Sequence, residues 1–283
     1  MKNILKIAGI LILIPILIFV GFVLFSIVTD FRPPPERVLK INSVEESTPL
    51  SIGDTFTLMT FNIGYCGLDS GQDFFMDGGE MSRSRSKKQT LRNCEEILDF
   101  VNYHEPQILI IQEIDERSSR SWKVNQLKRF RQELSGMNNV FAYNYRVPWV
   151  PVPLKRPMGS VKSGLATFSE FPLKIARRLQ LPGKEDFPRQ LFVLDRCLLE
   201  TRIPIEGGKT LLLVNLHLSA YDKGGKVRKH QLKYVKDYLQ TNYDEDTYII
   251  LGGDWNHLLS PRQLKNKGTH EVWPEWLVLL PEN

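Results

Sequence analysis

The chain has 283 residues, of which 42% are hydrophobic and 24% charged, so it can bury a full-sized core and is not mainly disordered. Its formal net charge of +5 includes Lys2 and Lys6 ahead of an apolar N-terminus, so the remainder has only a mild positive excess, which does not identify nucleic acid as a partner. Three cysteines at irregular spacing, without a CxxC pair, argue against a disulfide framework and against a zinc site.

The first predicted element is a transmembrane helix over residues 7–28, which contain no charge. At about 1.5 Å per residue this stretch can cross a hydrocarbon core of roughly 30 Å. A cleaved signal peptide is the competing interpretation, but its apolar region is usually only about 7 to 15 residues long and ends at a small-x-small site, which "FSIVTD" lacks. Because Lys2 and Lys6 precede the span, we expect a single-pass protein of the cell membrane, with residues 1–6 in the cytoplasm and the folded domain outside.

Consecutive prolines favour an extended polyproline conformation, so residues 29–53 are expected to form a stiff tether ahead of a domain at 54–283. The domain begins with a strand, "TFTLMTFNI", expected to be buried on both faces, and a long loop rich in Gly, Asp and Ser follows it. Periodicity and turn signals then predict helices over 91–105, 122–134 and 226–240, and strands over 107–115, 140–147, 164–169, 173–180, 191–200, 210–218 and 247–251. Many strands joined by short turns favour an α+β fold, a largely antiparallel two-sheet sandwich with helices on its outer faces.

Four of these strands end in polar residues: Asn62, Glu113, His217, and Asp254 with Asn256. Each has an ordinary structural explanation, because a Glu at a strand end is usually solvated, a His between leucines is usually a core residue, and Gly-Gly-Asp followed by Asn is typical of a turn. Asp254 and Asn256 are two residues apart, so both side chains point the same way if the extended conformation persists. Four such strand ends in one chain are difficult to attribute to chance.

In order and separation, "TFNI", "QEID", "NLHLSA" and "GGDWN" resemble the signatures of the endonuclease/exonuclease/phosphatase superfamily, whose fold is the DNase I-like αββα sandwich of four layers. The resemblance spans roughly residues 54 to 260, and "KSGLATFSEFPL" is similar to the family's central strand. It implies hydrolysis of a phosphate ester with the help of Mg²⁺ or Mn²⁺, which prefer oxygen ligands.

The resemblance also implies roles for individual residues. Glu113 would be the principal metal ligand, with Asn62 beside it. His217 would lie near the phosphate as an acid or hydrogen-bond donor, and Asp254 and Asn256 would orient the attacking water and the transition-state oxygens. Asn215 is on the same side of its strand as His217 and is expected to contact the substrate.

The chain departs from the family pattern at its C-terminal end. In the family, a late aspartate and a terminal Ser-Asp-His follow the GDxN motif, whereas this chain ends at "GTHEVWPEWLVLLPEN". Neither His257 nor His270 stands in the matching context. We therefore expect the last strands of the sandwich to be missing, which would leave an apolar end at "VWPEWLVLL" and unpaired sheet edges.

These observations support a membrane-anchored, extracytoplasmic phosphoesterase. Nucleic acid and a phospholipid headgroup are equally credible substrates, and a small phosphomonoester is less favoured. The alternatives are a catalytically impaired surface module that binds a phosphate ligand or a partner, and a non-functional remnant. The sequence identifies no protein partner.

Overall fold

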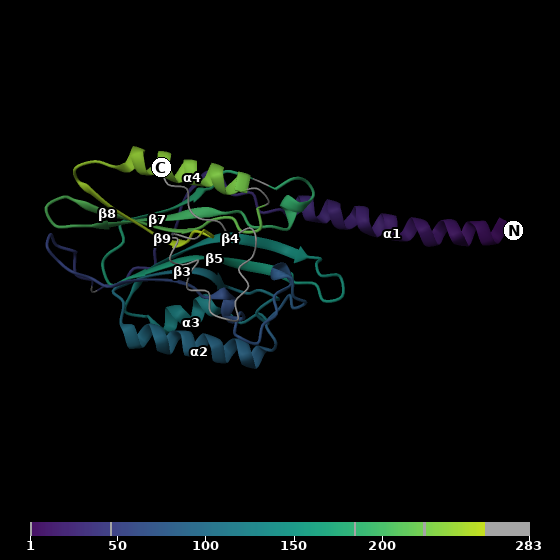
Figure 1. The fold of residues 1–283 in the computed structure, drawn as a ribbon, viewed down its shortest axis with the longest axis horizontal. Helices are drawn as coiled ribbons and strands as arrows, with labels where there is room; N and C mark the ends of the chain where they lie inside the picture. Colours follow the sequence, from purple (N-terminus) through teal and green to yellow (C-terminus); the bar gives the residue numbers. More distant parts are fainter. Residues whose placement is uncertain (1, 46, 184, 223–224, 258–283) are drawn as a thin grey trace.

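The computed structural model describes residues 2–45, 47–183, 185–222 and 225–257 (Figure 1). Two β-sheets pack face to face, with helices α2 and α3 outside one sheet and α4 outside the other (Figure 1). The predicted four-layer αββα sandwich is therefore confirmed. The helices are α1 (Lys2–Val28), α2 (Lys87–His104), α3 (Gln126–Glu133) and α4 (Lys226–Asn242), and the strands are β1 (Glu36–Val38), β2 (Leu58–Asn62), β3 (Ile108–Asp115), β4 (Asn138–Val150), β5 (Gly159–Ser169), β6 (Ile175–Gln180), β7 (Cys197–Pro204), β8 (Thr210–His217) and β9 (Thr247–Asp254).

Both sheets are mainly antiparallel, as predicted. One has the strand order β1-β6-β7-β8-β9 and the other β2-β3-β5-β4. In the described part of the chain, the parallel neighbours within these sheets are β2 with β3 and β8 with β9. Their crossover connections contain α2 and α4, which is why these helices cover the outer faces of the sheets.

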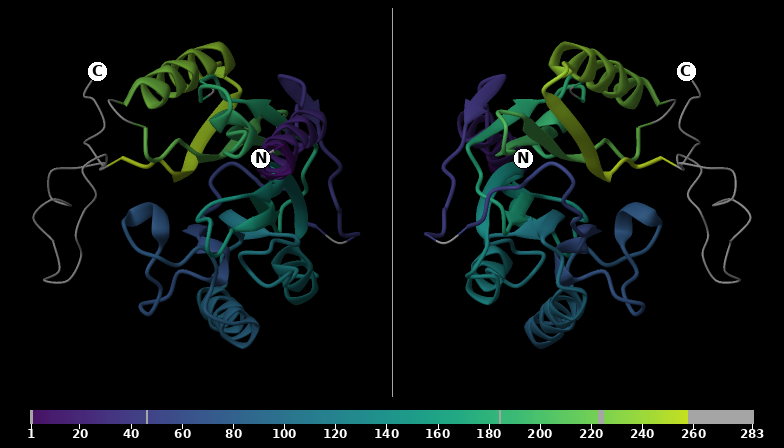
Figure 2. Two further views of the ribbon diagram at one scale, coloured as in Figure 1. Left: turned by 90° about the vertical axis from the view of Figure 1, so that its right-hand side faces the viewer. Right: turned by 90° about the vertical axis from the view of Figure 1, so that its left-hand side faces the viewer.

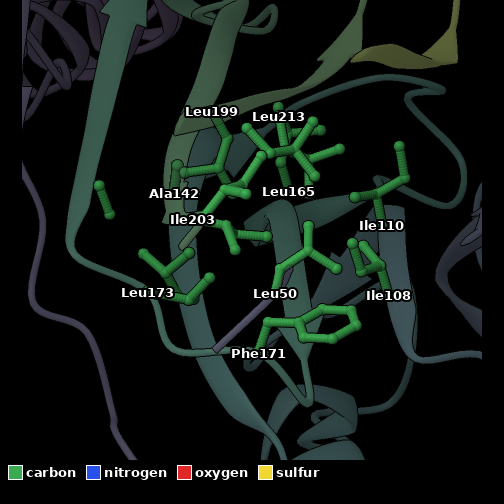
Figure 3. Packing of buried hydrophobic residues seen from close by; sticks show 14 of the residues in the cluster. Leu50, Ile108, Ile110, Ala142, Leu165, Phe171, Leu173, Leu199, Ile203 and Leu213 are labelled. Carbon is green, nitrogen blue, oxygen red and sulfur yellow. The ribbon is translucent and has the colours of Figure 1, made fainter. Parts of the chain in front are cut away.

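Side-chain alternation along the strands divides the core into layers. Ile108 and Ile110 of β3 face the other sheet, where they meet Leu213 of β8 in the central cluster (Figure 3). Leu109 and Ile111 point the other way, toward α2 and α3. A strand that is apolar on both faces is what a sandwich covered by helices requires.

Helix α1 contains a candidate membrane span, Gly9–Val28, which is long and apolar enough to cross a bilayer. The chain that follows differs from the expected tether of residues 29–53. β1 pairs antiparallel with β6, and Leu50 is only 3% exposed within the central cluster. A strand of three residues gives little sequence signal, and β1 pairs with a strand that is distant in the sequence. The preceding prolines therefore favoured the prediction of a tether.

Two strands also differ locally from the expectations. β2 is half-buried rather than buried on both faces, because in the described structure it has β3 as its only neighbour in the sheet. The strand predicted over 191–200 begins only at Cys197, after a short 3-10 turn at Arg189–Leu191. The expected apolar end and His270 lie outside the described residues.

Candidate active site

The predicted strand-end residues meet at one end of the sandwich. Asn62 ends β2 and pairs with Gln112, so it lies beside Glu113 of the parallel strand β3. In the other sheet, His217 pairs directly with Asp254, and these two residues end the parallel strands β8 and β9. Because parallel neighbours end at the same edge of a sheet, and the two sheets are stacked, the four side chains converge.

The side chain of Asn62 connects the two sheets. Its Nδ2 donates a hydrogen bond to Asp254 Oδ2 at 2.7 Å and a longer one to Glu113 Oε1 at 3.4 Å. Its Oδ1 accepts from the backbone N–H of Gly64 at 3.0 Å, which fixes the orientation of the amide. One amide therefore holds two carboxylates from different sheets next to each other.

Glu113 reaches this position because β3 is irregular. By strict alternation its side chain would share the helix-covered face with Leu109 and Ile111. The pairing with β5 shifts register between Ile111 and Ile114, and Glu113 has φ of +57°. This bulge turns the carboxylate toward the cavity, at the cost of a backbone conformation that is strained for a residue with a side chain.

Arg120 holds the other side of the Glu113 carboxylate. Its Nη1 donates to Glu113 Oε2 at 3.2 Å and its Nη2 to Asp115 Oδ1 at 3.0 Å, while the guanidinium lies 4.1 Å from the ring centroid of Tyr65. Burial alone would lower the pKa of Arg120, but Asp115 and Glu113 outweigh it and raise that pKa. No sequence signal marks these two residues, because Arg120 lies in a loop and Tyr65 in the short 3-10 helix Gly64–Cys66, and neither segment has a periodic pattern.

His217 and Asp254 form an electrostatically coupled pair, with His217 Nε2 3.5 Å from Asp254 Oδ2. Burial, reinforced by the charge of Arg196, lowers the pKa of His217 to about 4, although Asp254 acts in the opposite direction. Burial alone would raise the pKa of Asp254, but His217 and the hydrogen bond from Asn62 outweigh it and lower that pKa. Near neutral pH the pair is thus a neutral imidazole beside an ionised carboxylate.

Two glycines let β9 deliver Asp254, since the strand runs through them instead of ending before them as predicted. Gly253 has φ of +135°, and a Cβ there would lie 2.0 Å from the backbone oxygen of Leu216. A Cβ on Gly252 would lie 2.5 Å from Ile110 Cδ1 in the facing sheet. Residues with side chains would force β9 away from both neighbours and displace its last carboxylate.

The extended conformation does not persist to Asn256, which has φ of +49°. Asp254 Oδ1 accepts from the Asn256 backbone N–H at 2.9 Å, and Asn256 Nδ2 donates to the backbone oxygen of Leu218 at 2.8 Å. The turn leaves Asn256 in the wall of the cavity, beside Asp254.

Asn215 has a different environment. It is fully buried, its Nδ2 donates to the backbone oxygens of Ile111 and Ala166 at 3.0 Å each, and its Oδ1 accepts from Gln112 Nε2 at 2.8 Å. These bonds tie β8 to the facing sheet. Asn215 is outside the set of described residues that line the cavity, so its expected substrate contact stays a prediction.

The converging residues line one end of a cavity of about 1220 Å³. Arg196, which was not among the predicted site residues, lines this cavity and donates from Nη1 to the backbone oxygen of His217 at 3.3 Å. It directly precedes β7, which is antiparallel to β8. In an antiparallel pair, the start of one strand lies beside the end of the other, so the first residues of β7 lie at the site next to the last residues of β8. Residues at strand starts were therefore also candidates for the site.

The donor set fits a hard divalent cation. The described residues contain no group of three His, Cys, Asp or Glu side chains that could hold a metal together. Glu113 and Asp254 do supply two carboxylates within hydrogen-bonding distance of the Asn62 amide. Mg²⁺ is commonly bound through one or two carboxylates with water completing its octahedron, and zinc sites need more nitrogen or sulfur ligands than this.

Comparison with known proteins agrees with this geometry. Residues 59–278 match the model of the Endonuclease/Exonuclease/phosphatase family. The chain belongs to this family. A comparison with curated protein sequences gives no match.

Similar solved structures are known, and the Beutenbergia protein among them supports the fold. The endonuclease/exonuclease/phosphatase from Beutenbergia cavernae DSM 12333 has a TM-score of 0.50 and 18% identity over 73% of this chain and 49% of its own. ANGEL2, a 2',3'-cyclic phosphatase, has a TM-score of 0.49 and 17% identity, and the match covers 76% of this chain and 57% of ANGEL2. A humanized D. rerio TDP2 has a TM-score of 0.46 and 14% identity, and the match covers 75% of this chain and 70% of that protein. The chain spans about half the length of the Beutenbergia protein.

Proposed function

We propose that this protein hydrolyses a phosphate ester, acting as a phosphodiesterase that depends on Mg²⁺ or Mn²⁺. The observation that carries the proposal is the convergence of Asn62, Glu113, His217 and Asp254 from both sheets at the end of one cavity. The family to which the chain belongs is named for endonucleases, exonucleases and phosphatases, and enzymes of these three kinds act on phosphate esters.

Glu113 would be the principal ligand of the cation, with Asn62 beside it. The cation, when bound, would neutralise charge that develops on the phosphoryl oxygens during in-line attack. Arg120 supports this role, because its bonds to Glu113 and Asp115 fix the carboxylate that would bind the ion.

Asp254 is suited to orienting the attacking water. Its lowered pKa keeps it ionised, which makes it a strong hydrogen-bond acceptor but a weak base. The water oxygen bonds to phosphorus, the ester P–O bond breaks, and the leaving oxygen gains the proton that the water gives up. Asn256, in the wall beside Asp254, would donate to the phosphoryl oxygens.

His217 would donate a hydrogen bond to the phosphate as a neutral imidazole, because its lowered pKa leaves it uncharged near pH 7. Its Nδ1 is buried and has no hydrogen-bond partner among the described residues. An unsatisfied buried polar atom is costly, and the His217 side chain lines the cavity, which supports a role in contacting a ligand.

We further propose that α1 crosses the cell membrane once, with residues 1–6 in the cytoplasm and the catalytic domain outside. The absence of charge from residues 7–28 and the position of Lys2 and Lys6 ahead of them support this orientation. The domain proposed for residues 54–283 would then include β1 and Leu50 from the preceding segment, since both pack on it.

The test is hydrolysis of bis(p-nitrophenyl) phosphate by the full chain with MgCl₂ or MnCl₂, in parallel with EDTA. Turnover that EDTA abolishes and Glu113→Gln removes supports the proposal. A folded protein without turnover above this variant would contradict it, and phosphate binding by that protein would favour the impaired binding module.

A further inference from the structure

The cavity has two chemically different ends. The polar end contains Asn62, Glu113, His217 and Asp254. Beside it, an apolar cluster lines the same cavity with Phe74, Phe75, Val150, Met158, Phe192 and Leu194. A phosphate bound at the polar end would therefore have an apolar wall next to it, which suits a substrate whose phosphate is attached to a hydrocarbon portion.

This apolar end of the cavity reaches the base of α1. Asp30, two residues past the helix, lines the cavity, and the Phe22 ring of α1 stacks on Phe192 with centroids 5.7 Å apart. The left view of Figure 2 looks at this end of the sandwich, with α1 directed toward the viewer. If α1 spans a bilayer, the cavity lies next to the membrane surface.

Loops next to the cavity expose apolar side chains. Leu154, at the tip of the hairpin that joins β4 to β5, is 85% exposed, and Phe187, five residues before Phe192 in the chain, is 60% exposed. The hairpin lies at the end of the sandwich from which α1 leaves (Figure 1). Lys155 and Arg156 directly follow Leu154. An apolar tip beside basic residues is the combination that enters a bilayer interface and meets anionic headgroups.

We infer that the substrate is a membrane phospholipid, presented to the site from the bilayer in which α1 is anchored. This inference rests on the proposed phosphoesterase activity. The phosphodiester would lie at Glu113 and His217 and the glycerol-linked hydrocarbon portion along the wall that includes Phe192. Water adds to phosphorus and one P–O ester bond breaks, which yields a phosphomonoester and an alcohol without any other reactant.

A polynucleotide fits this cavity less well. It carries a phosphate in every unit, and proteins that bind single strands track these phosphates with a continuous basic groove. The arginines that line this cavity are already engaged, because Arg120 contacts Glu113, Arg189 contacts Glu185 and Arg196 contacts the backbone oxygen of His217. The wall next to the polar end is apolar, and Leu154 is exposed on the hairpin between β4 and β5.

The experiment uses the full chain reconstituted in vesicles of phosphatidylethanolamine and phosphatidylglycerol, with MgCl₂. Conversion of lipid phosphodiester to phosphomonoester is followed by ³¹P NMR, and bis(p-nitrophenyl) phosphate hydrolysis is measured on the same vesicles. Glycerophosphoethanolamine, which has the same headgroup without acyl chains, is the matched soluble substrate. We expect the lipid to be hydrolysed at least about tenfold faster than the deacylated compound, because only the lipid can bury hydrocarbon on the apolar wall.

Leu154→Glu tests the loop contact. It should lower the ratio of the lipid rate to the bis(p-nitrophenyl) phosphate rate by about tenfold, the effect of removing one apolar side chain from the interface. Tyr103→Glu is the matched control, because Tyr103 is 83% exposed near the end of α2, at the opposite end of the sandwich. It should leave the ratio unchanged.

The outcomes separate the two proposals. Hydrolysis of bis(p-nitrophenyl) phosphate with intact lipid would overturn the lipid inference and leave the phosphoesterase proposal standing, and cleavage of a single-stranded oligonucleotide would then identify the substrate as nucleic acid. Equal ratios for the two variants would overturn docking through the hairpin. Absence of turnover on every substrate would overturn both proposals.

Discussion

Asn62, the last residue of β2, donates a 2.7 Å hydrogen bond to Asp254, the last residue of β9, so the edge strands of the two described sheets are joined at the site itself. The same contact holds two carboxylates in place and links the layers of the sandwich. Packing of the sheets and geometry of the site therefore depend on each other here.

Replacing Asn62 with Leu, which has a similar volume and no donor, should lower kcat/KM for bis(p-nitrophenyl) phosphate about 10- to 100-fold. The lost bond to a charged group corresponds to about 1.5 to 3 kcal/mol. Steady-state kinetics check this. Asn102→Leu is the control, since Asn102 bonds to Glu133 between α2 and α3, and an equal loss in that variant would contradict a specific role for Asn62.

Acid should destabilise the protein through His217. Its pKa lies near 4 in the fold and near 6.5 in an unfolded chain, so the unfolded state binds more protons between these values. The free energy of unfolding should therefore rise from pH 4 to pH 6.5, by about 2 to 3 kcal/mol from this residue. Denaturant titrations in EDTA at a series of pH values measure this free energy of unfolding, and His217→Gln should reduce its increase between pH 4 and pH 6.5. His230→Gln, on an exposed position of α4, should retain it.

The two glycines of β9 should respond differently to substitution. Gly252→Ala should cost about 1 to 3 kcal/mol through its clash with Ile110 Cδ1, and Ile110→Val, which removes that atom, should recover part of this cost in the double variant. Gly253→Ala should not be rescued, because the obstacle is the Leu216 backbone oxygen and φ is positive. Additive stabilities for Gly252→Ala with Ile110→Val would contradict the close approach of the sheets.

Arg120→Met should lower the free energy of unfolding by about 3 to 5 kcal/mol, because it leaves the buried Asp115 carboxylate without its cation. Arg120→Met with Asp115→Asn should be more stable than Arg120→Met alone, since the second change removes the unpaired charge. Chemical denaturation measures both. If the second substitution adds to the destabilisation, the ion pair is not the cause.

The sequence revealed the strands through their apolar runs and the turn signals between them, and it revealed the site only through residues at strand ends. Glu113 illustrates the limit: regular alternation would place it under α2, and only a bulge set by pairing with β5 turns it to the cavity. Arg120 and Arg196 approach from outside the regular strands, so no period marks them. β1 was missed because its three residues are stabilised by β6, which is far away in the sequence.

The most direct test of the central claim is metal-dependent turnover of bis(p-nitrophenyl) phosphate by the full chain, with Glu113→Gln and His217→Ala as site variants and Tyr103→Ala as an exposed control. Turnover that requires Mg²⁺ or Mn²⁺, persists in Tyr103→Ala and falls at least about 100-fold in both site variants is the predicted result. A folded chain whose turnover is the same in all four proteins, or absent from all of them, would contradict a phosphoesterase site at the ends of β3 and β8.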